Sequence, residues 1–249
     1  MMLKVRNITK SYGKHKILED ISFDLKTGES LVLAGRSGSG KTTLAKIIIG
    51  LEQCDSGEVY LFDKKLNGNY RKRTFSDLAR IQYIFQDPYS ALEPNFTLEK
   101  TLMETIKICK RNKYKTMEID EALAMVDRGF LEQKKRKIST FSGGQRQKIC
   151  IARALLTYPK LIIADEATSM LDFDNRIEIN SLLDKIKREF ELSIIAIVHD
   201  IDFHNDKWDR IAVINNCKIV DLMKFKDFFQ HASSDYSKEL INSHKYFYG

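Results

Sequence analysis

The chain is short of proline and has no paired cysteines, and each shortage excludes a class of protein. Three prolines and twelve glycines in 249 residues argue against long disordered linkers. The four cysteines are scattered without a C-x-x-C pair, so we expect neither a zinc site nor a disulfide framework and interpret them as reduced cytosolic thiols. No apolar run reaches the roughly 18 residues that a membrane-spanning helix needs, and we expect no signal peptide.

The positive charge of the chain is not arranged in a nucleic-acid-binding pattern. The net charge of +7 is compatible with nucleic acid, an anionic membrane surface or a nucleotide as partner. Its densest clusters, at 71–73 and 134–137, are not interleaved with aromatic residues that would stack on bases. A solvated face explains these clusters, and we expect no nucleic-acid partner.

A phosphate-binding loop is the strongest signal that the sequence does contain. Residues 35–42, GRSGSGKT, fit the pattern G-x-x-x-x-G-K-[ST] between an apolar strand at 31–34 and a helix over 44–49. Small residues let successive backbone N–H groups turn toward an anion, and the helix N-terminus adds a partial positive charge. Lys41 is placed to reach the β- and γ-phosphates of a nucleoside triphosphate, and Thr42 to ligate Mg²⁺. The expected nucleotide contacts here are Gly35, Ser37, Gly38, Ser39, Gly40, Lys41, Thr42 and Thr43.

Apolar strands that alternate with helices predict an α/β fold. Strands at 161–164 and 193–198 alternate with helical periodicity, which favours a mostly parallel sheet covered on both faces. Alternating residues that end at Leu25 add β-structure within the first thirty residues. A type I′ hairpin is predicted with Asn215 and Asn216 at its centre.

The stretch between the phosphate loop and the strand at 161–164 is far too long for a single crossover. Its helical character from 88 to 158 predicts a helical subdomain inserted into the core. We therefore predict one domain over 1–249, with a core at 1–87 and 159–222, inserted helices at 88–158 and a short C-terminal tail at 223–249.

Two adjacent carboxylates follow the apolar strand at 161–164. Ligands of open α/β sheets bind at the carboxyl ends of the strands, which is where Asp165 and Glu166 stand. Asp165 is placed to hold Mg²⁺ directly or through water. Glu166, one residue later, points elsewhere and can orient or deprotonate an attacking water. Because the chain also contains a phosphate loop, the two carboxylates indicate a site of nucleotide hydrolysis rather than an ordinary acidic turn after a strand.

A second anion-binding turn begins at Ser142. A serine and two glycines that open a helix form a nest of backbone N–H groups, although S-G-G alone is a common loop. One nucleotide needs one phosphate cradle, and this chain has two. The second is explained if it serves a nucleotide held by another subunit, through Ser142, Gly143, Gly144 and Gln145.

In these motifs the chain resembles the nucleotide-binding subunits of ABC (ATP-binding cassette) transporters. The resemblance covers about residues 3–222, and residues 141–145, FSGGQ, resemble the family signature L-S-G-G-Q with Phe141 in place of leucine. It implies a P-loop NTPase cassette with an N-terminal antiparallel β-subdomain, which hydrolyses ATP with Mg²⁺. It also implies that two cassettes close head-to-tail over two ATPs.

The resemblance gives roles to four further positions. Tyr12 matches the aromatic residue that stacks on adenine, and His199 matches the histidine that contacts the γ-phosphate. Gln86 matches the glutamine that links Mg²⁺ and the attacking water to the membrane subunit. Asp172 ends a segment that matches the loop crossing the dimer interface. The expected catalytic residues are thus Glu166, His199 and Gln86, and the expected metal ligands are Thr42, Gln86 and Asp165.

Residues 86–94, QDPYSALEP, resemble a segment of importers of dipeptides, oligopeptides and nickel, including metal chelates of the opine-metallophore kind, although Glu93 stands where asparagine is usual. This implies transmembrane permeases, a second cassette that is a paralogue or a copy of this chain, and an external solute-binding protein. It also implies a peripheral location on the cytoplasmic face of the membrane. The iron–sulfur cysteine cluster of many such ATPases is not expected, because no cysteine follows Cys217.

Three other functions stay open at this point. An exporter ATPase is compatible with the same motifs, because transport direction lies largely in the permease. A soluble ABC ATPase acting on nucleic acid or the ribosome usually carries a long coiled coil or a second cassette, and this chain has neither. A P-loop enzyme of another kind, such as a kinase, leaves the turn at 142–145 unexplained.

Overall fold

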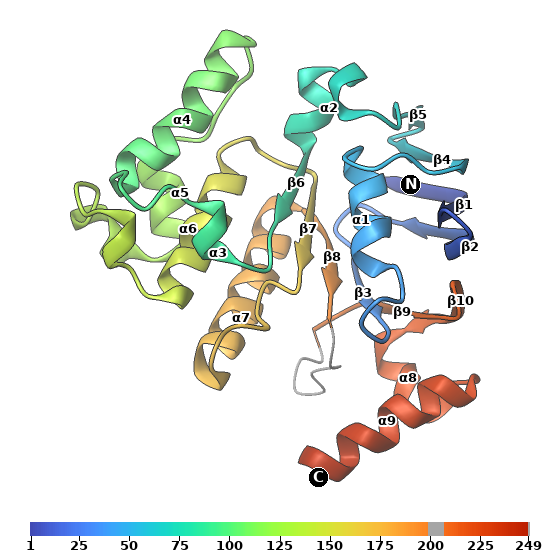
Figure 1. The fold of residues 1–249 in the computed structure, drawn as a ribbon. Coiled ribbons are helices and arrows are strands. Elements are labelled where there is room, and N and C mark those ends of the chain that lie inside the picture. Colours follow the sequence, from blue (N-terminus) through green and yellow to red (C-terminus); the bar gives the residue numbers. More distant parts are fainter. Residues whose placement is uncertain (199–206, 249) are drawn as a thin grey trace. The chain divides into compact units, whose positions relative to one another are not determined.

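A computed structural model describes residues 1–198 and 207–248, with the side chains of the last helix as far as residue 242 (Figure 1). The residues group into two compact units. The first unit combines Met1–Arg73 with Ser193–Gly249, and the second unit is Thr74–Leu192. Each unit contains strands and helices of its own, so each is described separately.

The first unit opens with a four-stranded sheet in the order β2-β1-β4-β5, in which neighbouring strands are antiparallel. Buried and more exposed residues alternate along β1, because successive side chains of a strand point to opposite faces. The predicted N-terminal β-structure is therefore confirmed. The strands are β1 (Leu3–Tyr12), β2 (His15–Leu25), β4 (Ser56–Leu61) and β5 (Lys64–Lys65).

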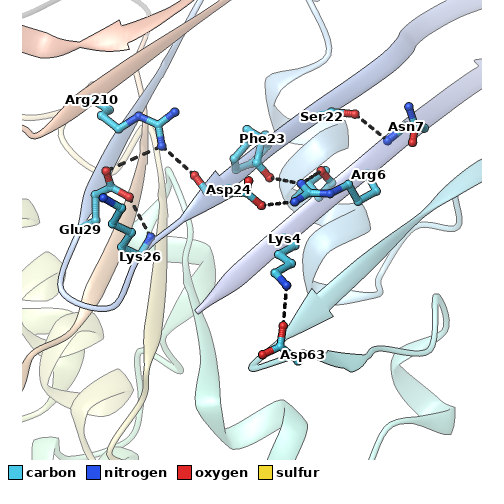
Figure 2. A network of polar contacts seen from close by, with 11 residues as sticks. Lys4, Arg6, Asn7, Ser22, Phe23, Asp24, Lys26, Glu29, Asp63 and Arg210 are labelled. Carbon is cyan, nitrogen blue, oxygen red and sulfur yellow. Dashed lines mark hydrogen bonds and ion pairs between the residues drawn. The ribbon is translucent and has the colours of Figure 1, made fainter. Parts of the chain in front are cut away.

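Polar and charged side chains form contacts within this sheet and beside the end of β2 (Figure 2). Arg6 on β1 pairs with the carboxylate of Asp24 and donates to the carbonyl of Phe23, both on β2. Arg210 donates to the Asp24 carbonyl at 2.8 Å and lies 3.7 Å from a Glu29 carboxylate oxygen. Each partly solvated pair adds little stability, but the two contacts of Arg6 favour the observed pairing of β1 with β2.

The other strands of the first unit run in the order β10-β9-β3-β8. β3 (Ser30–Ala34) is parallel to β8 (Ser193–Ile197) and to β9 (Arg210–Asn215), whereas β10 (Lys218–Lys224) is antiparallel to β9. Every residue of β3 and β8 is buried, as expected for parallel strands that are covered on both faces. The predicted α/β class with mostly parallel core strands is confirmed.

Two turns of the first unit depend on left-handed residues. Helix α1 (Lys41–Ile49) ends at Gly50, whose φ of 82° stops the helix where the sequence predicted. The hairpin between β9 and β10 turns at Asn216–Cys217, with φ angles of 47° and 67°. The predicted centre at Asn215–Asn216 was therefore wrong by one residue, because Asn215 still belongs to β9. Two positive φ angles are what a type I′ turn requires.

The C-terminal tail, which the sequence left unassigned, forms two helices. These are α8 (Phe225–His231) and α9 (Asp235–Tyr248), and a 3₁₀ helix η1 (Tyr70–Lys72) lies elsewhere in the first unit. α8 buries two phenylalanines and α9 buries Tyr236 and Ile241 in one hydrophobic cluster with residues of β3 and β9. The tail is therefore part of the core of the first unit.

The second unit combines a pair of parallel strands with helices. β6 (Ile81–Ile84) and β7 (Leu161–Asp165) pair with Tyr83 opposite Ile163. The predicted helical character of 88–158 is confirmed, while the predicted boundaries of that subdomain stay a prediction. None of the described helices combines the length and the apolar character that crossing a bilayer requires. The helices of this unit are α2 (Phe75–Arg80), α3 (Pro88–Ala91), α4 (Leu98–Arg111), α5 (Ile119–Val126), η2 (Arg128–Glu132), η3 (Ile138–Thr140), α6 (Gly143–Leu155) and α7 (Phe173–Phe190).

Candidate nucleotide site

The phosphate loop is shaped by glycines that tolerate no side chain. Gly35 has a φ of 150°, and a Cβ built there would lie 2.3 Å from the carbonyl oxygen of Ile214. Gly40 has a φ of 97°, and its Cβ would lie 2.7 Å from a methyl group of Leu18 and 2.9 Å from the carbonyl oxygen of Ile17. Such close approaches, with left-handed backbone, need glycine. The loop is therefore a preformed backbone cradle.

The groups that face the loop suit an anion. Lys41 is only 4% exposed, and its ammonium donates to the carbonyl of Gly35 at 2.6 Å and to that of Arg36 at 2.9 Å. The hydroxyl of Ser39 is buried and has no hydrogen-bond partner among the described residues. Helix α1 starts after Gly40, which has no side chain to cap the helix. A cation, a hydroxyl and a helix N-terminus thus converge where the sequence predicted phosphate binding.

Arg36, the residue after Gly35 in the phosphate loop, contacts the C-terminal helix α9. Its guanidinium lies 3.0 Å from a carboxylate oxygen of Glu239 and 5.4 Å from the ring centroid of Tyr236, both on α9. Arg36 and Glu239 are well exposed, so the ion pair is weak. No local sequence pattern predicts this contact, because the two partners are 203 residues apart in the chain.

Tyr12 ends β1 and is 47% exposed as a residue, which favours an accessible ring that can stack on a base. The ammonium of Lys10 lies 5.1 Å from the ring centroid. Lys10 itself is fixed by Glu52, at 2.8 Å, and the hydrogen bond to Glu52 raises the pKa of the Lys10 ammonium despite burial. The lysine therefore stays charged beside the ring.

In the second unit, Asp165 closes β7 and is 7% exposed. Its carboxylate accepts a hydrogen bond from the hydroxyl of Tyr83 on the neighbouring strand β6. Burial raises the pKa of Tyr83, and the hydrogen bond to Asp165 and the nearby carboxylates raise it further. Tyr83 therefore keeps its proton and acts as the donor. Sequence reasoning missed this residue, although its place on a strand next to the acidic pair was a usable signal.

Glu166 has a left-handed backbone with a φ of 49°. Such a conformation costs a non-glycine residue about 1 kcal/mol, and strain of this kind gathers at functional sites. The carbonyl of Glu166 accepts from the backbone N–H of Ser169 at 3.0 Å and from its hydroxyl at 2.9 Å. Gln86 in turn donates to the Ser169 hydroxyl at 3.3 Å. Ser169 thus connects two predicted catalytic residues, Gln86 and Glu166.

The signature turn at 142–145 is a capping box at the start of α6. The Ser142 hydroxyl accepts from the Gln145 backbone at 3.3 Å, and the Gln145 side chain accepts from the Ser142 backbone at 3.1 Å. A Cβ at Gly144 would lie 2.3 Å from the side-chain oxygen of Asn175. A Cβ built at Gly143 would lie 3.3 Å from the hydroxyl of Tyr89.

Asp172 caps the N-terminus of α7, the helix that packs against α6. Its carboxylate accepts from the backbone N–H of Asn175 at 2.9 Å and from the Asn175 amide at 2.8 Å, and these hydrogen bonds lower the Asp172 pKa. Asn175 therefore contacts the predicted interface loop and the signature turn at once. No sequence motif points to Asn175, because its role depends on contacts between distant segments.

The predicted metal ligands are oxygen donors, which suit Mg²⁺. Thr42 belongs to the first unit, and Gln86 and Asp165 belong to the second. Among the residues that the structure describes, no group of three or more His, Cys, Asp or Glu side chains is arranged to hold a metal ion. Mg²⁺ is usually bound through one or two carboxylates together with substrate phosphates and water. His199 lies outside the described residues.

Comparison with known proteins assigns the family. Residues 18–169, more than half of the chain, match the family described as ABC transporter. The oligopeptide transport ATP-binding protein OppF of Bacillus subtilis is 33% identical, over 97% of this chain and 82% of that protein. OppF of Streptococcus pyogenes is 35% identical, over 97% of this chain and 81% of that protein. The glutathione import ATP-binding protein GsiA of Pectobacterium atrosepticum is 35% identical, over 91% of this chain and 36% of that protein.

Solved structures agree with the fold. The protein cbiO1 from Clostridium perfringens, part of the ABC transporter complex cbiONQ, has a TM-score of 0.80 and 26% identity, covering 98% of this chain and 94% of that one. A dimeric ATP-binding cassette in a post-hydrolysis state with ADP and phosphate has a TM-score of 0.69 and 28% identity. The match covers 90% of this chain and 98% of that one. The chain belongs to the ABC transporter family, as a subunit that binds and hydrolyses ATP to drive transport.

Proposed function

We propose that the transport driven by this chain is the uptake of peptides. The observation that carries the proposal is the likeness to two oligopeptide transport proteins over 97% of the chain. The likeness to a glutathione import protein supports it, because glutathione is itself a small peptide. The segment at 86–94 resembles peptide importers as well as nickel importers. Nickel and metal chelates, the other cargoes implied by that segment, find no support among these relatives.

ATP is proposed to bind first at the phosphate loop. Lys41 would exchange the carbonyls of Gly35 and Arg36 for the β- and γ-phosphates, which are stronger partners for an ammonium because they carry full negative charge. The buried hydroxyl of Ser39 would gain a phosphate oxygen as partner. The exposed ring of Tyr12 would stack on adenine. The remaining loop contacts expected from the sequence are Ser37, Gly38, Gly40, Thr42 and Thr43.

Mg²⁺ is the proposed resident cofactor, held by Thr42, Asp165 and Gln86 together with phosphate oxygens. When bound, the ion neutralises charge that develops on the transferred phosphoryl group. Asp165 is buried and oriented by Tyr83, which suits a metal ligand.

Glu166 is the proposed general base. It orients and deprotonates a water that attacks the γ-phosphorus, the bond from that phosphorus to the bridging oxygen breaks, and ADP and phosphate leave. Gln86 reaches the backbone carbonyl of Glu166 through Ser169, and the family resemblance implies that Gln86 would link the attacking water to the membrane subunit. His199 would contact the γ-phosphate, as the family resemblance implies.

A second cassette is the proposed partner for the signature turn. The turn from Ser142 to Gln145 contains no cation, so it is better suited to complete a site that already holds ATP than to bind ATP alone. Asp172 and Asn175 would stand at the same interface. A paralogue or a second copy of this chain fits the role, and the dimeric cassette with ADP and phosphate is a precedent for it.

Permease subunits are the proposed partners for the segment from 86 to 96. Tyr89 in this segment is 53% exposed, and neighbouring Phe85 is 45% exposed, so large aromatic rings face solvent. Exposed aromatic residues of this kind are enriched at protein interfaces. The complex would hold this subunit on the cytoplasmic face of the membrane and would include an external solute-binding protein.

Reconstitution tests the proposed cargo. The chain would be purified with its proposed permeases and solute-binding protein, and placed in vesicles with ATP on the cassette side. We expect a labelled oligopeptide to accumulate with the binding protein and the ATPase rate to rise with the loaded binding protein. Accumulation of Ni²⁺ or a metal chelate without peptide would refute peptide as the cargo. Movement of cargo toward the opposite side would instead indicate an exporter.

A further inference from the structure

Tyr83 and Asp165 are brought together by the register of two strands. Tyr83 lies opposite Ile163 in the β6–β7 ladder, and Asp165 is two residues further along β7. Side chains two residues apart on a strand leave the sheet on the same face, and diagonal neighbours on adjacent strands lie within reach of a tyrosine. The hydroxyl of Tyr83 accordingly donates to Oδ2 of Asp165. Regular sheet pairing, rather than a loop, sets this contact.

The ring of Tyr83 also contacts an aromatic neighbour. Phe85 meets it edge to face, with the ring centroids 4.8 Å apart and the planes at 62°. Asp165 is buried, so water has little access to compete for its carboxylate. A hydrogen bond to a charged group is stronger than one between neutral groups, and low access to water strengthens it further. The hydrogen bond from Tyr83 therefore restrains the orientation of the Asp165 carboxylate.

We propose that Tyr83 is a positioning residue for the metal site, acting through Asp165. By donating to Oδ2, the Tyr83 hydroxyl restrains the plane in which the Asp165 carboxylate can lie. The inference rests on the proposed function, in which Asp165 is a metal ligand. Removal of a hydrogen-bond partner from a ligating carboxylate typically lowers metal affinity 10- to 100-fold. Tyr83 should have an effect of this size.

Tyr83→Phe tests the proposal, because it deletes the hydroxyl and keeps the ring beside Phe85. Tyr60→Phe is a matched control. Tyr60 is on β4 of the first unit and donates to the carboxylate of Glu58, so the same atom is removed from a tyrosine–carboxylate pair elsewhere. The probe is Mn²⁺, titrated into the full chain with a non-hydrolysable ATP analogue and followed by electron paramagnetic resonance.

We expect Tyr83→Phe to raise the Mn²⁺ concentration for half-saturation at least about tenfold and Tyr60→Phe to change it less than about twofold. In steady-state assays of the assembled transporter, the apparent KM for Mg²⁺ should rise by the same factor. The kcat at saturating Mg²⁺ should fall much less, because excess metal compensates for a misoriented ligand. A merely structural tyrosine would lower the urea midpoint of unfolding without changing Mn²⁺ affinity, and that outcome overturns the proposal.

Asp165→Asn separates this inference from the proposed function. If Asp165→Asn weakens Mn²⁺ binding while Tyr83→Phe binds Mn²⁺ like the unmodified chain, the positioning role is wrong and the proposed metal site stands. If Asp165→Asn leaves Mn²⁺ binding unchanged, Asp165 is not a ligand and both are wrong. Equal weakening by Tyr83→Phe and Tyr60→Phe also contradicts the proposal, because the effect would then be unrelated to Asp165.

Discussion

The phosphate loop of the first unit and the signature turn of the second unit are both anion-binding turns at helix starts, but they are held differently. Backbone shapes the loop, since Gly35 leaves no room for a side chain, and buried Lys41 supplies a charge. Side chains shape the turn, since Ser142 and Gln145 cap one another and Asn175 fills the space beside it. A charged, preformed cradle suits tight binding, and a neutral turn suits completion of an occupied site. We infer that the first unit sets ATP affinity and the second sets turnover.

The largest effect that this comparison predicts is at Glu166. Glu166→Gln should keep ATP affinity within about threefold and lower the ATPase rate of the assembled transporter by about 100- to 10,000-fold, because a general base is lost. Fluorescent-nucleotide binding and phosphate release measure the two quantities. A normal ATPase rate would show that the second unit does not supply the base.

The next effect separates the two turns. Lys41→Ala should weaken ATP binding to the isolated chain by about 100-fold, because charge-assisted hydrogen bonds to phosphate are lost. Ser142→Arg should leave that affinity nearly unchanged and abolish the ATPase activity of the assembled transporter. Calorimetry on the isolated chain and phosphate release from the complex give both readouts. Loss of ATP binding by isolated Ser142→Arg would mean that the turn serves its own chain's nucleotide.

A matched pair of glycine substitutions compares how the two turns are held. Gly35→Ala places a Cβ against a rigid carbonyl of Ile214 at a left-handed φ, so we expect the free energy of unfolding to fall by about 3 kcal/mol. The nearest atoms to a Cβ in Gly144→Ala belong to the side chain of Asn175, which can rotate if it gives up its hydrogen bonds to Asp172, and alanine favours a helix, so the cost should be smaller, about 1 kcal/mol. Urea unfolding measures both. Equal costs would remove the distinction between a backbone-held and a side-chain-held turn.

The smallest effect tests the contact between the loop and α9. Glu239→Gln removes a negative charge near the phosphate loop and frees Arg36, so ATP should bind about threefold more tightly at low salt, with the gain lost at high salt. Asp235→Asn is the control, since it removes the same charge from α9 at a residue that pairs with Lys238 instead. An equal gain from both variants would mean that net charge, rather than the ion pair, is responsible.

Local patterns were sufficient to predict most of the fold and part of the candidate site. The phosphate loop was predictable because its glycines, lysine and helix start are consecutive in sequence. The end of α1 at Gly50 was predictable for the same reason. The hairpin centre was misplaced by one residue, because strand pairing keeps Asn215 in β9 and moves the turn to Asn216 and Cys217. A cysteine is not a residue type whose presence in a sequence suggests a left-handed backbone.

Contacts between distant segments could not be predicted. Tyr83 meets Asp165 only because β6 and β7 pair in one particular register, and a shift by one residue would turn the tyrosine to the other face. Arg36 meets Glu239 only because α9 packs in the hydrophobic cluster of the first unit. Asn175 is likewise placed beside Gly144 by packing between α6 and α7. Each of these contacts depends on tertiary structure that no short motif encodes.

The left-handed backbone of Glu166 has an evolutionary consequence. Asparagine and glycine accept this conformation more readily than glutamate, so folding alone would favour either of them at this position. Glu166→Asn should therefore fold at least as stably as the unmodified chain while losing turnover. A duplicated copy of this chain that no longer had to hydrolyse ATP would gain stability by losing Glu166, and this position should be among the first to change.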